Sequence, residues 1–178
     1  MEKFNKGAVL ITGTTSGVGL NTLKPLIEFG WDIIAVNRSS KRAIDEANKI
    51  LKNNEIESIN FIEIDLSDLN SVRDGANKIA TRFGNVLKVL ICNAAVYKPR
   101  LKRPERSSQG FENSMAVNHF GHFLLINLLL ESILNSDEKI ILNGEISKFI
   151  PRITILGTVT ANSLELGGKI PCLLYTSP

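Results

Sequence analysis

The residues best suited to chemistry lie in a glycine-rich turn that follows an apolar run near the start of the printed sequence. Residues 8–11 have the composition of a buried strand, and the turn after them leads into a helical pattern. Gly13 permits the sharp turn, Gly17 lets a bound group approach the backbone, and Gly19 lets the helix pack closely on the strand. Free N–H groups at the start of that helix favour an anion, and the pyrophosphate of a dinucleotide is the expected one. A plain strand, turn and helix with no ligand is the alternative.

A basic turn follows the second apolar run, residues 31–36, at the position that distinguishes the nicotinamide cofactors. An acidic residue there would bind the ribose hydroxyls of NAD, whereas the planar guanidinium of Arg38 suits a 2′-phosphate. Lys41 and Arg42 add positive charge nearby. The sequence therefore favours NADP, which a reductase uses as NADPH, and a solvated basic turn is the alternative interpretation.

Two further strand ends and one helical pattern carry polar residues with a structural or a functional role. Asp65 serves either a ligand or the following turn and helix start, a role for which Ser67 and Asp68 are equally suited. Asn93-Ala94-Ala95 follows the fourth apolar run, and its small side chains leave room for a cofactor. Asn118 stands between apolar neighbours in a long helical pattern, so its amide requires partners whether its role is catalytic or structural.

Alternating strand-like and helix-like runs predict a doubly wound α/β fold with helices on both faces of a parallel sheet. The expected strands are residues 8–11, 31–36, 59–64, 86–92 and 151–156, in the order 3-2-1-4-5. The expected helices are residues 18–29, 41–52, 69–83 and 111–135. The buried stripe of the last helix is expected at Phe120, Phe123, Leu124, Leu128 and Leu129. Residues 137–150 look like an insertion, in which residues 140–144 form either a short hairpin or an extra turn.

Composition places the 178-residue chain among single-domain globular proteins, with 43% hydrophobic and 22% charged residues. A net charge of +3 is too small to indicate nucleic-acid binding. No apolar run has membrane-spanning length and residues 1–6 lack a signal-peptide pattern, so a cytoplasmic setting is expected. Cys92 is expected to pack as a small buried residue, and two cysteines define neither a metal nor a disulfide pattern. His119 and His122 lack a third ligand, so no metal site is expected.

The Thr-Gly-x-x-x-Gly-x-Gly spacing, together with the segments that end the other strands, resembles the short-chain dehydrogenase/reductase family. That resemblance implies a Rossmann-type doubly wound parallel sheet that binds NAD(P)(H). The cofactor contacts that it implies are Gly13, Thr15, Ser16, Gly17, Val18, Gly19, Arg38, Arg42, Asp65, Leu66, Asn93, Ala94 and Ala95. It also implies catalytic roles for Asn118, which steadies the active-site lysine through a water, and for Thr158, whose hydroxyl stands where the family has a serine.

Within that family, four segments resemble the light-dependent protochlorophyllide reductases: residues 92–97, 118–125, 156–162 and 165–171. The resemblance implies a small-molecule substrate, the pigment protochlorophyllide, which NADPH reduces when light excites the pigment. Tyr97 would contact the pigment or pack as a buried structural residue, and a peripheral attachment to a photosynthetic membrane stays open. Asn37, where these enzymes commonly have cysteine, and Pro25 depart from the pattern. A reductase of retinoid-like or carbonyl substrates and an inactive NADP-binding protein are the alternatives.

The end of the printed sequence has a separate explanation. Residues 172–178 can be back-translated into the end of a transposon-based sequencing adapter, and are expected not to be native. Residues 1–171 would then form an incomplete NADP-binding domain, truncated after the fifth strand. The printed sequence contains no Tyr-x-x-x-Lys pair, because Leu101 stands four residues after Tyr97 and the printed sequence ends three residues after Tyr175. The chain is therefore expected to be inactive alone.

Overall fold

A parallel sheet of five strands forms the centre of this computed structural model, which describes residues 7–98, 103–136, 139–142 and 145–157. The strands are β1 (Ala8–Thr12), β2 (Asp32–Asn37), β3 (Ile59–Glu63), β4 (Leu87–Cys92) and β7 (Arg152–Ile155). Their order is β3-β2-β1-β4-β7, and every neighbouring pair is parallel. The predicted order is confirmed, because β7 is the fifth strand of this sheet along the chain.

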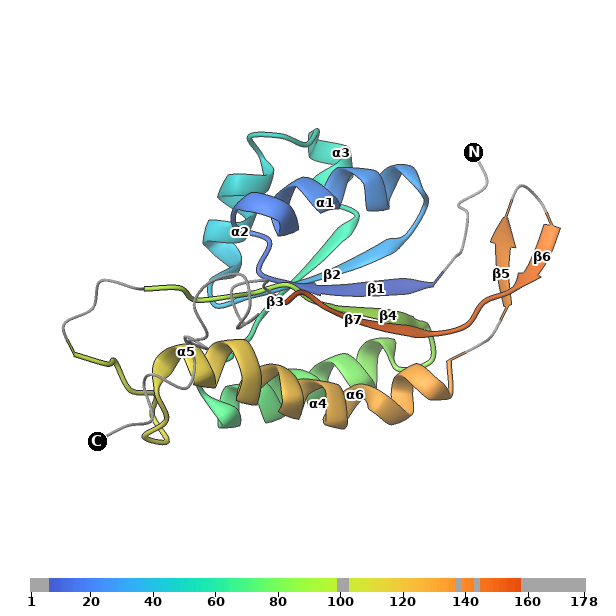
Figure 1. The fold of residues 1–178 in the computed structure, drawn as a ribbon. Coiled ribbons are helices and arrows are strands. Elements are labelled where there is room, and N and C mark those ends of the chain that lie inside the picture. Colours follow the sequence, from blue (N-terminus) through green and yellow to red (C-terminus); the bar gives the residue numbers. More distant parts are fainter. Residues whose placement is uncertain (1–6, 99–102, 137–138, 143–144, 158–178) are drawn as a thin grey trace, which may run out of the picture.

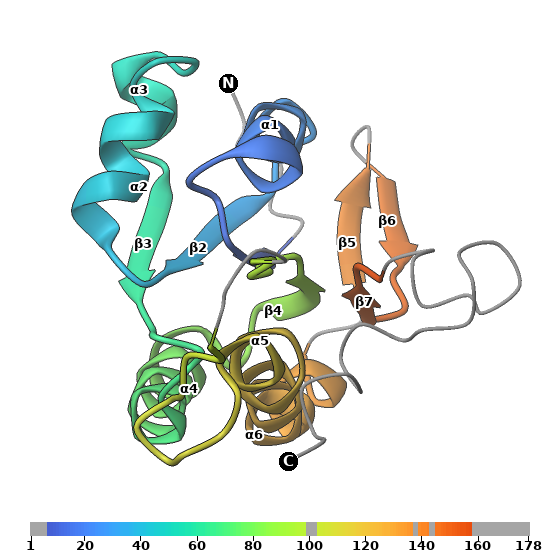
Figure 2. The same ribbon diagram turned by 60° about the vertical axis from the view of Figure 1, so that its left-hand side comes forward.

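Helices cover both faces of the sheet. On one face lie α1 (Gly17–Glu28), α2 (Ser40–Ala47) and the short α3 (Asn53–Ile56), as Figure 1 shows. On the other face α4 (Leu69–Phe83) packs against α6 (His122–Leu134). Figure 2 shows these two helices side by side, across the sheet from α1 and α2. These crossovers bring the carboxyl ends of β1 to β4 together at one edge, where a doubly wound sheet binds its ligands.

Two apolar layers, one on each face, hold the sheet between its helices. Successive residues of a strand face opposite sides, so the neighbours Leu10 and Ile11 of β1 belong to different layers. Leu10 packs with Leu125 and Leu129 of α6, whereas Ile11 packs with Leu23 of α1. Burial on both faces explains why the central strands are almost continuously apolar, as parallel strands usually are.

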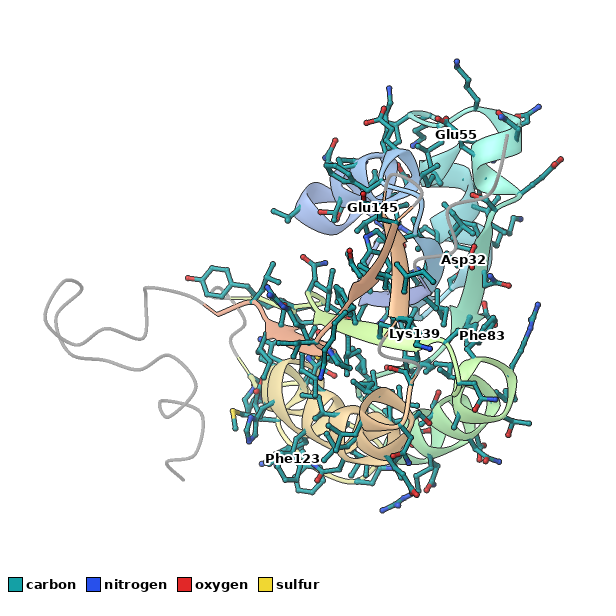
Figure 3. All side chains as sticks on the ribbon, turned by 90° about the vertical axis from the view of Figure 1, so that its right-hand side faces the viewer. Asp32, Glu55, Phe83, Phe123, Lys139 and Glu145 are labelled. Carbon is teal, nitrogen blue, oxygen red and sulfur yellow. The ribbon has the colours of Figure 1, made fainter. Side chains whose placement is uncertain are left out.

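The long helix predicted at residues 111–135 is interrupted by a wider turn. It begins with α5 (Asn113–Met115), passes through the π-helical segment η1 (Ala116–Gly121), and continues as α6. A π turn contains an extra residue, so it rotates the face that the following helix presents. The predicted buried stripe is therefore partly wrong, because Phe123 is 61% exposed and Leu128 is 38% exposed. Figure 3 shows Phe123 on the side of α6 that faces away from the sheet.

The buried residues of α6 are His122, Leu125, Leu129 and Ile133, of which only Leu129 was predicted. Residues Asn113–Leu134 have the length and the mean hydropathy, 1.3, of a membrane span, although the sequence predicted none. One face of α6 contacts α4 and β4, and only 33% of this apolar window is buried.

The helix predicted at residues 41–52 ends early. α2 stops at Ala47, and α3 begins only at Asn53. Leu51, between the two helices, turns inward and joins the buried layer on that face. Residues 48–51, which were predicted to continue the helix, instead form a turn and a bend that place Leu51 in the core.

The insertion forms a hairpin at the amino end of the sheet. β5 (Lys139–Leu142) and β6 (Glu145–Lys148) pair antiparallel, so the hairpin that the sequence offered as one alternative is confirmed. The ring of Phe149, which follows β6, meets the ring of Trp31 edge-on with their centroids 5.3 Å apart. The Nζ atom of Lys88 donates a hydrogen bond to the carbonyl of Lys139. Figure 1 shows the hairpin beside the starts of the strands, at the opposite end from the glycine-rich turn.

Candidate functional site

A cavity of about 260 Å³ lies at the carboxyl edge of the sheet. Its walls come from the turn after β1, the ends of β2, β3 and β4, and η1. Most of the predicted cofactor contacts line it, namely Gly13, Thr15, Ser16, Arg38, Arg42, Asp65, Leu66, Asn93, Ala94 and Ala95. Gly17, Val18 and Gly19 are not among its lining residues. The lining residues that sequence reasoning missed are Val36, Asn37, Ser39, Ile64, Val96 and Val117.

The glycine-rich turn has the shape that its composition predicts. Gly13 has φ of 75° and Gly17 has φ of 56°, both in the left-handed region that side chains disfavour. A Cβ at Gly19 would overlap the carbonyl oxygen of Gly13 and the side-chain amide of Asn93. Gly19 therefore permits close packing within the turn itself, and a larger residue there would displace the turn.

The start of α1 leaves backbone donors available beside the cavity. Ser16 precedes the helix in an extended conformation, and its side chain makes no capping hydrogen bond. No acidic residue occupies the first turn of α1. The first N–H groups of a helix have no partner within the helix, and the helix dipole makes them attractive to an anion. Ser16 also lines the cavity, so this positive helix end borders the space in which a ligand would lie.

Two arginines lie at the edge of the cavity beside β2. Arg38 directly follows β2, and Arg42 lies in the first turn of α2, whose N-cap Ser39 accepts a hydrogen bond from the Arg42 N–H at 3.3 Å. Within the described part of the chain, neither guanidinium group forms an ion pair or a hydrogen bond. Both positive charges are therefore exposed and available to a ligand.

Asn37 ties the end of β2 to the glycine-rich turn. Its Oδ1 accepts a hydrogen bond from the Thr14 N–H at 2.7 Å, and its Nδ2 donates one to the Thr14 Oγ1 at 2.8 Å. Only 5% of Asn37 is exposed, so both bonds are shielded from water. The sequence signal for this pair was the polar residue at the end of an apolar strand, where a buried amide must find partners.

Asp65 makes hydrogen bonds within its own turn. Its Oδ1 accepts from the backbone N–H of Ser67 at 2.9 Å and from the Ser67 hydroxyl at 2.6 Å. Asp68 caps α4 by accepting from the N–H of Asn70 at 3.0 Å. A hydrogen bond from the Gln109 side chain is the main cause that lowers the pKa of Asp68. Asp65 thus has the structural role that the sequence suggested, while the cofactor contact that the family resemblance implies stays a prediction.

Asn93 shapes the turn with its side chain. Its Nδ2 donates to the carbonyl oxygens of Thr12 at 2.8 Å and of Gly13 at 2.9 Å. Its backbone N–H donates to the Thr12 Oγ1 at 3.0 Å, and so does the N–H of Ala94, also at 3.0 Å. The ends of β1 and β4 are therefore joined by polar groups, which holds the wall of the cavity between them.

His122 reaches the same junction from the opposite helix. Its Nε2 lies 2.9 Å from the Thr12 Oγ1, and only 4% of the residue is exposed. Burial lowers the pKa of His122, and a hydrogen bond to the backbone of Asn118 partly opposes that shift. Sequence reasoning considered His122 only as a metal ligand, because nothing local in the sequence predicts a partner 110 residues away. No group of three potential metal ligands is found among the residues that the structure describes.

The proposed catalytic and substrate residues differ in what the structure shows. The Oδ1 of Asn118 accepts from the Val96 N–H at 2.7 Å, and its Nδ2 donates to the Val96 carbonyl at 2.9 Å. Asn118 thus has the partners that its sequence context required, and its catalytic role stays a prediction. Tyr97 is 75% exposed and does not line the cavity, so its interpretation as a buried structural residue is wrong. Thr158 lies outside the described residues, as do residues 172–178.

Cys92 lies at the end of β4 and is 2% exposed. Burial raises the pKa of the Cys92 thiol to about 12, so the group stays protonated near neutral pH. The prediction that it packs as a small apolar residue is confirmed.

The fold and the cavity together define a class, the doubly wound α/β domain with a glycine-rich turn after its first strand. Residues 7–144 match the sequence profile of the family described as short chain dehydrogenase. The chain belongs to the short-chain dehydrogenase family.

Relatives of the chain include two proteins named "Protochlorophyllide reductase, chloroplastic". The one from Chlamydomonas reinhardtii is 38% identical over 167 residues, which cover 93% of this chain and 39% of the relative. The one from Cucumis sativus is 40% identical over 174 residues, which cover 96% of this chain and 40% of the relative. The chain therefore spans about two fifths of the length of these curated relatives.

A solved structure supports the fold independently. The bulky-bulky ketone specific alcohol dehydrogenase from Comamonas testosteroni superimposes with a TM-score of 0.69, over 96% of this chain and 62% of that one. Its sequence is only 20% identical, so this likeness supports the architecture and carries no statement about the ligand.

Proposed function

We propose that this chain carries the NADPH-binding part of an oxidoreductase that reduces protochlorophyllide in a light-dependent reaction. The single observation that carries the cofactor assignment is the pair of arginines at the cavity, Arg38 and Arg42, whose guanidinium groups have no partner within the described residues. A guanidinium binds a phosphate through two parallel hydrogen bonds, and the residue directly after β2 is Arg38 rather than an acidic residue that would bind ribose hydroxyls.

The described residues fit a dinucleotide with an additional phosphate. The α1 start offers unpaired N–H groups to the pyrophosphate, beside glycines whose missing Cβ atoms keep the turn narrow. Arg38 and Arg42 would hold the 2′-phosphate, and Asp65 and Leu66 would border the adenine. The small residues Asn93-Ala94-Ala95 would border the nicotinamide end. When bound there, NADPH supplies a hydride.

The substrate assignment rests on the relatives and not on a described pocket. Two relatives bear the name protochlorophyllide reductase, and the chain matches them over more than nine tenths of its length. In the proposed reaction Asn118 steadies a water near the proton donor, and the Thr158 hydroxyl orients the substrate. Tyr97, which is exposed beside the loop held by Asn118, would contact the pigment. The proton donor is not assigned to a residue of this chain.

The compartment also belongs to this proposal. The relatives are named as chloroplastic proteins, which supports a plastid setting for the parent enzyme over the cytoplasmic one that the sequence suggested. Attachment to the periphery of a membrane stays a prediction.

The cofactor assignment is tested by titrating the purified chain with NADPH and with NADH. Arg38→Ala removes a charge-assisted hydrogen bond, so NADPH affinity should fall on the order of 10-fold to 100-fold while NADH affinity stays unchanged. The matched control is Arg73→Ala, which removes an exposed arginine of α4 that does not line the cavity. Equal losses for both cofactors would contradict the 2′-phosphate assignment.

The substrate assignment requires the full-length protein. Protochlorophyllide and NADPH are mixed with it in darkness, and absorbance is followed before and after a flash. Reduction only after the flash supports the proposal. Reduction in darkness at the same rate points instead to a general carbonyl or retinoid reductase, and cofactor binding without any reduction points to an inactive binding protein.

A further inference from the structure

The hydroxyl group of Thr12 lies at the centre of a buried junction between three elements. It accepts hydrogen bonds from the N–H groups of Asn93 and Ala94, each at 3.0 Å. The Nε2 of His122 lies 2.9 Å from the same oxygen. Thr12 is fully buried and His122 nearly so, so water does not compete for these groups. The junction connects the ends of β1 and β4 to the first turn of α6.

The proton count of this junction determines the state of His122. A threonine hydroxyl has one proton and two acceptor positions. The two backbone N–H groups occupy both acceptor positions of Thr12, so its single proton points at the Nε2 of His122. That nitrogen must accept, and it is therefore unprotonated. The proton of the neutral ring lies on Nδ1, where it is available to the backbone carbonyl of Asn118.

We propose that His122 is a positioning residue for the cofactor site, which acts as the neutral Nδ1–H tautomer by orienting the Thr12 hydroxyl. The inference rests on the proposed NADPH site only for its effect on cofactor binding. By directing the hydroxyl, the imidazole keeps the backbone of Asn93 and Ala94 against the glycine-rich turn. These two residues line the cavity, so their position sets its shape.

The same imidazole connects the turn to the segment of Asn118. The backbone of Asn118 lies near the imidazole and raises its pKa, and the Asn118 side chain holds both polar backbone groups of Val96. The neighbouring Gly121 lies so close to the end of β3 that a Cβ would overlap the carbonyl oxygen of Leu66. Gly121 thus allows the helix to lie close to the strand ends, and from that position the adjacent His122 reaches the Thr12 hydroxyl.

The tautomer is measured without any cofactor. Nitrogen NMR of the purified chain, labelled at histidine, distinguishes a pyridine-type nitrogen, which carries no proton, from a pyrrole-type nitrogen, which does. We expect a pyridine-type Nε2 and a pyrrole-type Nδ1 for His122 at neutral pH. His119, exposed on η1 and without a hydrogen bond to Thr12, is the internal reference. A proton on Nε2 of His122 at neutral pH, in either the neutral or the charged ring, would overturn the proposal.

Variants test the positioning effect. Gln at position 122 can accept from the Thr12 hydroxyl and donate to a carbonyl, whereas Leu can do neither. We expect His122→Leu to weaken NADPH binding about tenfold and to speed hydrogen exchange at the Ala94 amide, and His122→Gln to restore most of both. His119→Leu is the matched control and should change neither. Equal behaviour of the Gln and Leu variants would show that only packing matters, and would overturn the proposal.

The readouts separate this proposal from the proposed function. If the wild-type chain binds no NADPH, the function proposed above fails, while the tautomer and the exchange at Ala94 still decide the role of His122. If His122→Leu does not fold, Thr12→Ser and Thr12→Val replace it. Serine keeps the hydroxyl, so hydrogen exchange at Ala94 should stay slow in Thr12→Ser and become faster in Thr12→Val. Exchange at Ala94 as slow in Thr12→Val as in the unchanged chain would overturn the proposal.

Discussion

The two ends of the sheet are built in different ways. At the carboxyl end, side chains from distant elements hold backbone groups in place: Asn37 holds Thr14, Asn93 holds the turn, and Asn118 holds Val96. At the amino end, the hairpin of β5 and β6 is held by a hydrogen bond from Lys88 to the Lys139 carbonyl and by the ring contact of Phe149 with Trp31, and β6 is largely exposed. The comparison teaches that polar contacts between elements are concentrated where a ligand needs a fixed backbone, whereas the other end accepts an insertion.

The largest expected effect concerns the narrowest part of the carboxyl end. Gly19→Ala places a Cβ against the Gly13 carbonyl and the Asn93 amide, and neither group is free to move. We expect the free energy of unfolding to fall by about 2–3 kcal/mol and NADPH binding to be lost. Urea unfolding and cofactor titration measure both quantities.

Gly110→Ala is the control for that substitution. Gly110 has φ of 84° but no atom would lie within 4 Å of an added Cβ, so only backbone strain of about 1–2 kcal/mol is expected. NADPH affinity should not change. A loss of binding in Gly110→Ala equal to that in Gly19→Ala would remove the distinction between the narrow turn and the rest of the chain.

The pair of Asn37 and Thr14 gives the next effect. Asn37→Ala leaves the buried N–H and hydroxyl of Thr14 without their partners, so we expect about 1–3 kcal/mol of destabilisation and weaker NADPH binding. The matched control is Asn127→Ala on α6, where the lost bond to the Phe123 carbonyl is exposed and the cost should stay within about 0.5 kcal/mol. Equal costs at the two positions would mean that burial does not distinguish these amides.

The pH dependence of stability tests the buried histidine at the carboxyl end of the sheet. Burial lowers the pKa of His122 in the folded chain below its ordinary value of 6.5, so the unfolded chain binds its proton at higher pH. The stabilisation that comes from keeping His122 neutral is complete above pH 6.5, and it is lost as the pH falls toward the pKa of His122 in the folded chain. Urea unfolding between neutral and mildly acidic pH should show a decline that His122→Gln reduces. An unchanged decline in that variant would assign the pH dependence to other groups.

The smallest effect is expected at the hairpin. Ile146 is 73% exposed on β6, so Ile146→Ser should change the free energy of unfolding by no more than about 0.5 kcal/mol. NADPH affinity should be the same as in the unchanged chain, because the hairpin lies at the opposite end of the sheet from the turn between β1 and α1 (Figure 1), and that turn lines the cavity. A change in NADPH affinity would show that the hairpin influences the cavity, and would contradict the view that the two ends of the sheet are independent.

Local patterns in the sequence were sufficient for the sheet, its order and the glycine-rich turn. Strand period, glycine positions and the residues after each strand depend on nearest neighbours along the chain, so they can be recognised without the tertiary fold. The same holds for Arg38 and Arg42, since residues after β2 reach the carboxyl edge in any doubly wound sheet.

The tertiary structure alone decided which polar groups meet. Thr12 and His122 are 110 residues apart, and Asn37 and Thr14 come from different strand ends, so no local pattern pairs them. The buried face of α6 likewise includes His122, Leu125 and Ile133, which the sequence did not predict, because the wider turn of η1 changes the phase of the helix that follows. Sequence periodicity determines that a face is buried, and packing against the sheet determines which residues that face contains.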